Sequence, residues 1–187
     1  MIKLKNIIAL AIVSALFVTT GCKKNDSPDP VGKYYFKFKA NGVSKDFRDG
    51  TLSNFNGTHH DNEYITSLGG SSSDTDPNIN VFVIGLTTEG LNKTNTTYTN
   101  YHTTAPGFEK AILLLLTYTD DNGTNYSAAF DDELIEATYP DGVANNQLTI
   151  TEATSTFIKG KFSGTLYATN FTKEMKITEG EFYLEED

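Results

Sequence analysis

Short apolar segments separated by turn residues recur along most of the chain, and this spacing constrains its fold more than any other feature. Residues 34–40 read YYFKFKA, in which aromatic or small residues alternate with Tyr35 and two lysines. A period of two is typical of a strand with one buried face. Asn41-Gly42 follows, a dipeptide that accepts the positive φ angles of a tight turn. The pattern predicts a hairpin that returns over residues 43–47.

Two further segments are apolar on both faces. Residues 78–86 read NINVFVIGL and residues 111–119 read AILLLLTYT. Strands of this kind are covered on both sides, and the second run is too short to cross a membrane. Asp121-Asn122-Gly123 predicts a turn after it, with residues 125–130 pairing back.

The remaining segments complete a β pattern. We expect strands at 63–68, 147–151 and 157–168, and a final pair, 174–178 with 180–184, that turns at Glu179-Gly180. Gly160 and Gly164 lie on the inner face, where a missing side chain lets another element approach or permits a bulge. Only residues 131–138 look helical.

Many short strands at near-regular spacing indicate a sandwich or a barrel. The predicted class is all-β, an antiparallel β-sandwich of about 8–10 strands with at most one short helix. An open or closed β-barrel of the lipocalin type is the alternative.

The N-terminus has the three zones of a secretion signal. Lys3 and Lys5 give a cationic start, residues 7–18 form an apolar run, and small residues precede Cys22. The run is too short to span a bilayer, and no polar stripe breaks it as in an amphipathic helix. We expect residues 1–21 to be a signal peptide.

Cys22 is the single cysteine of the chain. The segment Thr19-Thr20-Gly21-Cys22 resembles the bacterial lipoprotein motif, which implies acylation of the Cys22 thiol and a palmitate-bearing anchor in the membrane. Residues 22–32 are polar, contain two prolines and predict a flexible tether. Residues 33–187 are then a single β domain that has no internal disulfide to stabilise it.

The net charge of the chain limits the class of partner that it can bind. The chain has 24 acidic and 15 basic residues and a net charge of −9. Such a chain is unsuited to nucleic acid, because a phosphate backbone repels it. The basic residues are scattered and form no stripe in the sequence.

Several C-terminal patterns carry a second resemblance. The segments 148–151 (LTIT), 158–165 (IKGKFSGT) and 177–182 (ITEGEF) look like those of Bacteroidetes lipoprotein families of unknown function. Their shared pattern is an I-x-G-x-F-x-G strand followed by an I-T-x-G-x-F hairpin. The resemblance implies a β domain on a lipid tether, held at the outer membrane on its periplasmic face or at the cell surface, and it implies no catalytic residues.

Two polar clusters contain metal-ligand types. In the segment 57–63, His59 with Asp61 is a weak candidate pair, although neighbouring histidines on an extended strand point to opposite faces. In the segment 120–125, Asp120 and Asn122 resemble part of a calcium loop, but the glycine and glutamate that an EF-hand needs are not at the required positions. A solvated loop and a hairpin turn, respectively, explain these clusters better. No cofactor is expected.

Tyrosines provide the candidate ligand-binding residues. The chain has 10 Tyr and 12 Phe but no Trp. Tyr35, Tyr101 and Tyr183 are predicted to face outward, where their rings suit stacking on a sugar. Ordinary strand propensity explains the same residues.

No nucleophile elbow, phosphate-binding loop or metalloprotease motif is present in the sequence. We therefore expect a non-enzymatic binding module of the cell envelope, with a glycan or an envelope protein as its ligand. The loops at 50–62, 69–78 and 87–108 would meet that ligand. One alternative is a hydrolase of polysaccharide or peptide, which needs two carboxylates in one cleft. Another is a structural component with a long unpaired edge strand.

Overall fold

The structure is a computed structural model that describes residues 33–48, 50–58, 63–72, 76, 78–99, 106–128, 146–168 and 173–185. The chain divides into two units, residues 1–31 and 32–187, and every element described here belongs to the second. Within the described ranges the regular structure is entirely strand. The predicted helix at 131–138 lies outside them.

The described residues of this unit form one sheet of twelve strands. The strands are β1 (Tyr35–Ala40), β2 (Val43–Asp46), β3 (Leu52–Thr58), β4 (Glu63–Ser71), β5 (Val81–Glu89), β6 (Thr96–Thr99), β7 (Phe108–Lys110), β8 (Leu113–Thr119), β9 (Asn125–Ser127), β10 (Gln147–Ala153), β11 (Phe157–Ala168) and β12 (Glu174–Glu185).

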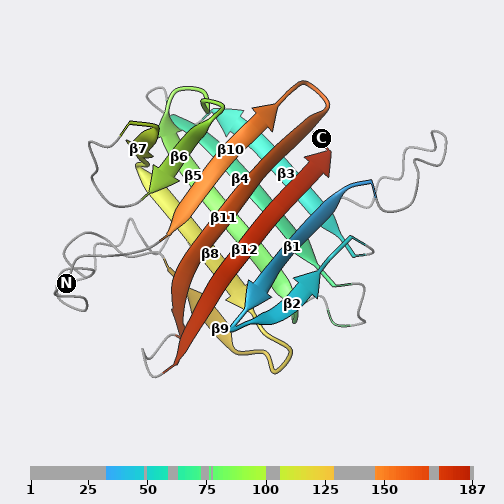
Figure 1. Ribbon diagram of the computed structural model, residues 1–187. Coiled ribbons are helices and arrows are strands. Elements are labelled where there is room, and N and C mark those ends of the chain that lie inside the picture. The colour runs from blue at the N-terminus through green and yellow to red at the C-terminus, as the bar shows by residue number, and fades with distance from the viewer. Residues whose placement is uncertain are drawn as a thin grey trace, which may run out of the picture. The chain divides into compact units, whose positions relative to one another are not determined.

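The sheet curls into a half-barrel. Its main path runs β2-β1-β12-β11-β9-β8-β5-β4-β3, and β10, β6 and β7 branch from β11. In Figure 1, β10, β11, β12, β1 and β2 form a front layer, and the strands of β3, β4, β5 and β8 cross behind it at a steep angle. The all-β class is confirmed, and the pairing is antiparallel except between β6 and β7.

Aromatic rings fill the space between the layers. Phe36, on β1, has its ring centroid 4.9 Å from that of Phe162 on β11 and 5.4 Å from that of Phe82 on β5. Each fully buried phenylalanine contributes about 1.5–3 kcal/mol through removal of its apolar surface from water. The rings that contact one another are Phe36, Phe38, Phe47, Phe82, Tyr118, Phe162 and Phe182.

The expected hairpin between residues 34 and 47 is confirmed. β1 pairs with β2 from Lys37↔Asp46 to Ala40↔Val43. Asn41 and Gly42 have φ angles of 47° and 82°, which fits the turn that the Asn-Gly dipeptide predicts. The inner-face position of Gly160 and Gly164 is also confirmed, because both glycines are buried.

The predicted turn at Glu179-Gly180 is wrong, because β12 continues through it. Both ladders of β12 shift register here, between Lys37 and Lys39 on β1 and between Phe162 and Gly164 on β11. Glu179 has a φ of 52°, so it is the extra residue of a β-bulge. Pairing on both sides keeps the strand continuous where the local sequence favours a turn.

The regions expected to be ligand-binding loops contain strands. β3 lies in the 50–62 region, the end of β4 extends into 69–78, and 87–108 contains β6 and the start of β7. β3 reads LSNFNGT, which shows little apolar alternation, and its pairing with β4 along its whole length holds it in the sheet. Short strands such as β6, β7 and β9 also raise the number above the expected 8–10.

Candidate functional site

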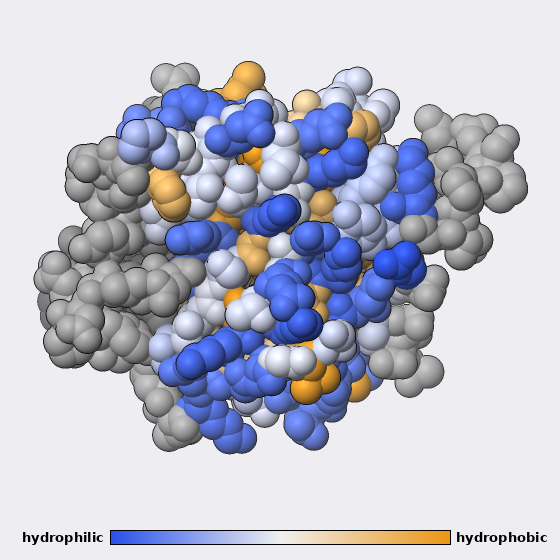
Figure 2. Space-filling view, viewed as in Figure 1, coloured by the Kyte–Doolittle hydropathy of each residue, from blue (hydrophilic) through white to orange (hydrophobic). Residues whose placement is uncertain are grey.

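The outward side chains of β1, β12, β11 and β10 form one continuous surface, which we call the outer face. Burial alternates strictly along β1 and β11, so the odd-numbered residues of both strands point outward. Two rows of cross-strand neighbours cross this face, Tyr35–Tyr183–Lys159 and Lys37–Glu181–Lys161–Thr149. Hydrophilic side chains cover most of the face in Figure 2, and hydrophobic ones show only in small separate areas.

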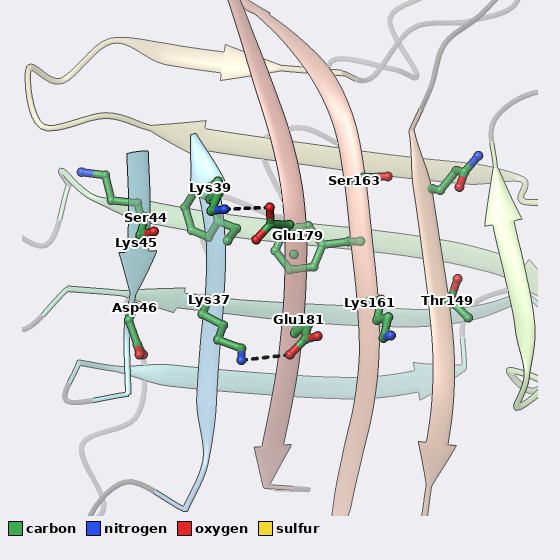
Figure 3. A pocket seen from close by; sticks show the side chains of 14 residues that line it. Lys37, Lys39, Ser44, Lys45, Asp46, Thr149, Lys161, Ser163, Glu179 and Glu181 are labelled. Atoms are coloured by element: carbon green, nitrogen blue, oxygen red, sulfur yellow. Dashed lines mark hydrogen bonds and ion pairs between the residues drawn. The ribbon is translucent and has the colours of Figure 1, made fainter. Parts of the chain in front are cut away.

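A polar hollow with a volume of about 720 Å³ lies on the outer face. Figure 3 shows charged side chains from neighbouring strands around it, with Lys161 between Glu181 and Thr149. The polar residues that line it are Lys37, Lys39, Ser44, Lys45, Asp46, Gln147, Thr149, Lys161, Ser163, Glu179 and Glu181. The side chain of Lys45 points away from the hollow, because its Nζ contacts Asp121.

Two ion pairs join β1 to β12 within the hollow. Lys37 Nζ lies 2.9 Å from Glu181 Oε2, and Lys39 Nζ lies 2.7 Å from Glu179 Oε1. The hydrogen bond to Glu181 raises the pKa of Lys37. All four side chains are at least one-third exposed, so each pair contributes no more than about 1 kcal/mol to stability.

Asp46 is also paired. Its Oδ2 accepts hydrogen bonds from Arg48 Nη2 at 2.8 Å and from Arg48 Nε at 3.0 Å. Burial raises the pKa of Asp46, but the hydrogen bonds from Arg48 outweigh it, and the net pKa is lowered. A general acid needs a carboxyl group that keeps its proton. The lowered pKa of Asp46 means that this carboxyl group loses its proton more readily than usual.

Four half-buried rings form an aromatic cluster beside the hollow. It comprises Tyr34, Tyr35, Phe157 and Tyr183. Tyr183 is its centre, with its ring centroid 4.9 Å from that of Tyr34, 5.2 Å from that of Phe157 and 6.2 Å from that of Tyr35. The structure therefore brings the predicted residues Tyr35 and Tyr183 together, whereas Tyr101 lies outside the described residues.

Every ring of the aromatic cluster has a cation near it. Lys159 Nζ lies 4.6 Å from the ring centroids of both Phe157 and Tyr183. Lys33 Nζ lies 4.6 Å from the Tyr34 centroid, and Lys37 Nζ lies 4.9 Å from the Tyr35 centroid. These distances are within the range of cation–π attraction.

The hollow and the aromatic cluster are parts of one surface. Glu181 lines the hollow and Tyr183 follows it by two residues on the same face of β12, a separation of about 7 Å. Sequence reasoning missed Tyr34, Phe157, Lys159 and Lys161. The period of two in residues 157–168 signalled that the lysines face outward, but only the β11–β12 register places them beside Tyr183 and Glu181.

The structure places Asp120 and Asn122 in the turn between β8 and β9. Asp120 Oδ1 accepts hydrogen bonds from the backbone N–H groups of Asn122 at 2.9 Å and Thr124 at 2.8 Å. The carboxylate thus closes the turn. His59 and Asp61 lie outside the described residues. Within the part of the chain that the structure describes, no group of three His, Cys, Asp or Glu side chains is close enough to hold a metal ion.

Comparison of the chain with protein-family models, with curated proteins and with solved structures gives no match. Among the described residues, no helix has the length and apolar character needed to cross a membrane.

Proposed function

We propose that this protein is a lipid-anchored lipoprotein of the cell envelope whose β domain binds a polysaccharide, without catalysis, on its outer face. The observation that carries the proposal is the aromatic cluster around Tyr183 next to a hollow lined by hydrogen-bonding side chains. Sugar rings offer apolar C–H faces that pack on aromatic rings, and hydroxyl groups that need polar partners.

The charge arrangement supports binding over hydrolysis. A glycoside hydrolase needs one carboxyl group that retains its proton and a second that is free to act as nucleophile or base. In the hollow, Glu179, Glu181 and Asp46 each lie against a cation, namely Lys39, Lys37 and Arg48.

The two ends of the sheet differ in the support that they give to a purely structural role. β2, at one end of the path, has four residues, which is short for a strand-addition site. β3, at the other end, has seven residues, and Asn54 Nδ2 donates a hydrogen bond to the backbone oxygen of Glu185 on β12 at 3.4 Å. This side-chain contact lies on the buried face of β3 and does not cover its backbone edge.

The anchoring part of the proposal rests on the lipoprotein motif at Cys22. It is tested by expressing the full chain and Cys22→Ser and following radiolabelled palmitate and membrane fractionation. We expect the wild type to be labelled and membrane-bound, and Cys22→Ser to lose both properties. An unlabelled wild type, or unchanged fractionation of the variant, would overturn the anchor.

The binding part is tested with full-length protein in detergent on an array of plant, animal and bacterial polysaccharides. Tyr183→Ala should weaken binding about three- to tenfold, because one stacked ring contributes roughly 0.5–1.5 kcal/mol. Tyr167→Ala is the matched control, since Tyr167 is a half-buried outward tyrosine of β11 outside the aromatic cluster.

Three outcomes would contradict this function. If the protein retains no polysaccharide and an envelope protein co-purifies with it specifically, the ligand is a protein instead. Equal binding by wild type and Tyr183→Ala would move the site elsewhere. Turnover of a chromogenic glycoside by the purified wild type would make the protein an enzyme.

A further inference from the structure

We infer that the ligand is an acidic polysaccharide, one that carries carboxylate groups such as those of uronic acids, and that Lys161 binds a carboxylate. This inference rests on the proposed polysaccharide site and names the chemical class of its ligand. Three related features of the outer face lead to it.

The first feature is that Lys161 has no ion-pair partner among the described residues. Its neighbours on the ladders are Glu181 on β12 and Thr149 on β10. Glu181 is already paired with Lys37 at 2.9 Å, and Figure 3 shows no interaction from the Lys161 ammonium to the residues drawn around it. Among the described residues Lys161 has no ion pair, and it is exposed. It is therefore available to an anion from outside the protein.

The second feature is the position of the cations over the aromatic cluster. Lys159 Nζ lies close to the rings of both Phe157 and Tyr183, and Glu152 Oε2 holds it at 3.1 Å. A neutral sugar that stacks here gains only ring contact. An acidic sugar that stacks here would also bring its carboxylate near the ammonium of Lys159, for which it would compete with Glu152.

The third feature is the local charge balance. The chain as a whole has 24 acidic and 15 basic residues, whereas at the hollow each of the three carboxylates is paired with a cation, and Lys161 adds one more positive charge. An acidic chain repels a polyanion over most of its surface. The ammonium of Lys161, which has no ion pair among the described residues, offsets this repulsion locally and favours contact of an acidic polymer with the outer face.

The test uses a matched pair of ligands that share one backbone. Full-length protein in detergent is titrated calorimetrically with oligogalacturonate and with its methyl ester, which has the same sugar rings without charge. Alginate and hyaluronan oligosaccharides serve as further acidic probes, and dextran and cellulose oligosaccharides as neutral ones. We expect an acidic probe to bind at least tenfold more tightly than its neutral counterpart, and its affinity to fall as sodium chloride is raised.

Variants of Lys161 test the residue itself. Lys161→Met should weaken binding of the acidic probe about tenfold and leave binding of any neutral probe unchanged, and Lys161→Arg should restore it. Lys176→Met is the matched control, because Lys176 is an exposed lysine of β12 that does not line the hollow. It removes the same charge and should leave the affinity unchanged.

The outcomes separate this inference from the proposed function. Equal or tighter binding of neutral probes, still sensitive to Tyr183→Ala, would overturn the acidic ligand and leave the polysaccharide site in place. An unchanged affinity in Lys161→Met would overturn the role of Lys161. Binding of acidic phospholipid vesicles in place of every polysaccharide would overturn both proposals.

Discussion

Phe182 on β12 lies directly over Gly160, its cross-strand partner on β11. A Cβ atom at Gly160 would stand 2.7 Å from Phe182 Cε1 and also against the backbone oxygen of Thr149. The reciprocal arrangement occurs two pairs further along, where the ring of Phe162 covers Gly180. Aromatic rings thus cover the backbone at both glycines, which compensates for the missing side chains in the strands.

This packing predicts that Gly160→Ala destabilises the domain by about 1–3 kcal/mol, the usual cost of inserting a methyl group into a packed core. Gly85 on β5 is the matched control, because a Cβ there would meet Leu115 Cβ at an ordinary 3.6 Å. Gly85→Ala should be neutral or stabilise by up to about 1 kcal/mol. Urea unfolding measures both variants, and equal effects would contradict the close approach of Phe182.

The aromatic core predicts a large effect of Phe36→Ala. Phe36 is fully buried and its ring touches rings from both layers, including Phe82 and Phe162. Loss of the side chain leaves a cavity between the layers, with a cost of about 3–5 kcal/mol.

Phe108→Ala is the control for Phe36→Ala, because Phe108 is 37% exposed and its loss should change stability by no more than about 0.5 kcal/mol. Thermal unfolding followed by circular dichroism compares the two variants. A wild-type melting temperature for Phe36→Ala would contradict the layered core.

Lys45 ties β2 to the turn between β8 and β9. Its Nζ lies 2.8 Å and 2.9 Å from the two carboxylate oxygens of Asp121 and 3.2 Å from Asn80 Oδ1. The hydrogen bond from Lys45 lowers the pKa of Asp121 below its usual 3.8. The folded state therefore gains stability above the unfolded pKa, and loses it as the pH falls through the lower folded pKa.

We accordingly expect Asp121→Asn to lower the free energy of unfolding at pH 7 by about 1 kcal/mol or less, because Asp121 is 59% exposed. The difference between wild type and variant should shrink below pH 3.8. Urea unfolding at a series of pH values measures it. A difference that stays constant down to pH 2.5 would show that the carboxylate charge is not involved.

The bulge at Glu179 predicts an unusual substitution pattern. Its φ of 52° is unfavourable for a β-branched residue, with a cost of about 1–3 kcal/mol. Glu179→Val should therefore destabilise the domain, although valine favours strands. Glu179→Gly should be tolerated, apart from the lost ion pair with Lys39.

Glu181→Val is the control for Glu179→Val, because Glu181 has a regular strand position two residues away and also loses an ion pair to a lysine, Lys37. Unfolding free energies of the two valine variants test the bulge. If they are equal, Glu179 does not have the left-handed conformation.

The sequence by itself determined the β class, the hairpin from Tyr35 to Asp46 and the outward direction of Tyr35 and Tyr183. These follow from alternation with a period of two and from turn dipeptides, both of which act between residues close in the chain. A local pattern also explains Asp120, one of the weak metal candidates, because its carboxylate accepts hydrogen bonds from backbone N–H groups of its own turn.

Only the tertiary structure decided that β12 continues through Glu179-Gly180, and that Tyr183 lies between Tyr35 and Lys159 while Lys161 lies next to Glu181. These facts depend on strand register between segments far apart in the chain, which no local pattern encodes. A register shift of one residue would reverse the faces of β12. The packing of Phe182 on Gly160 and of Phe162 on Gly180 helps to fix that register, and with it the composition of the outer face.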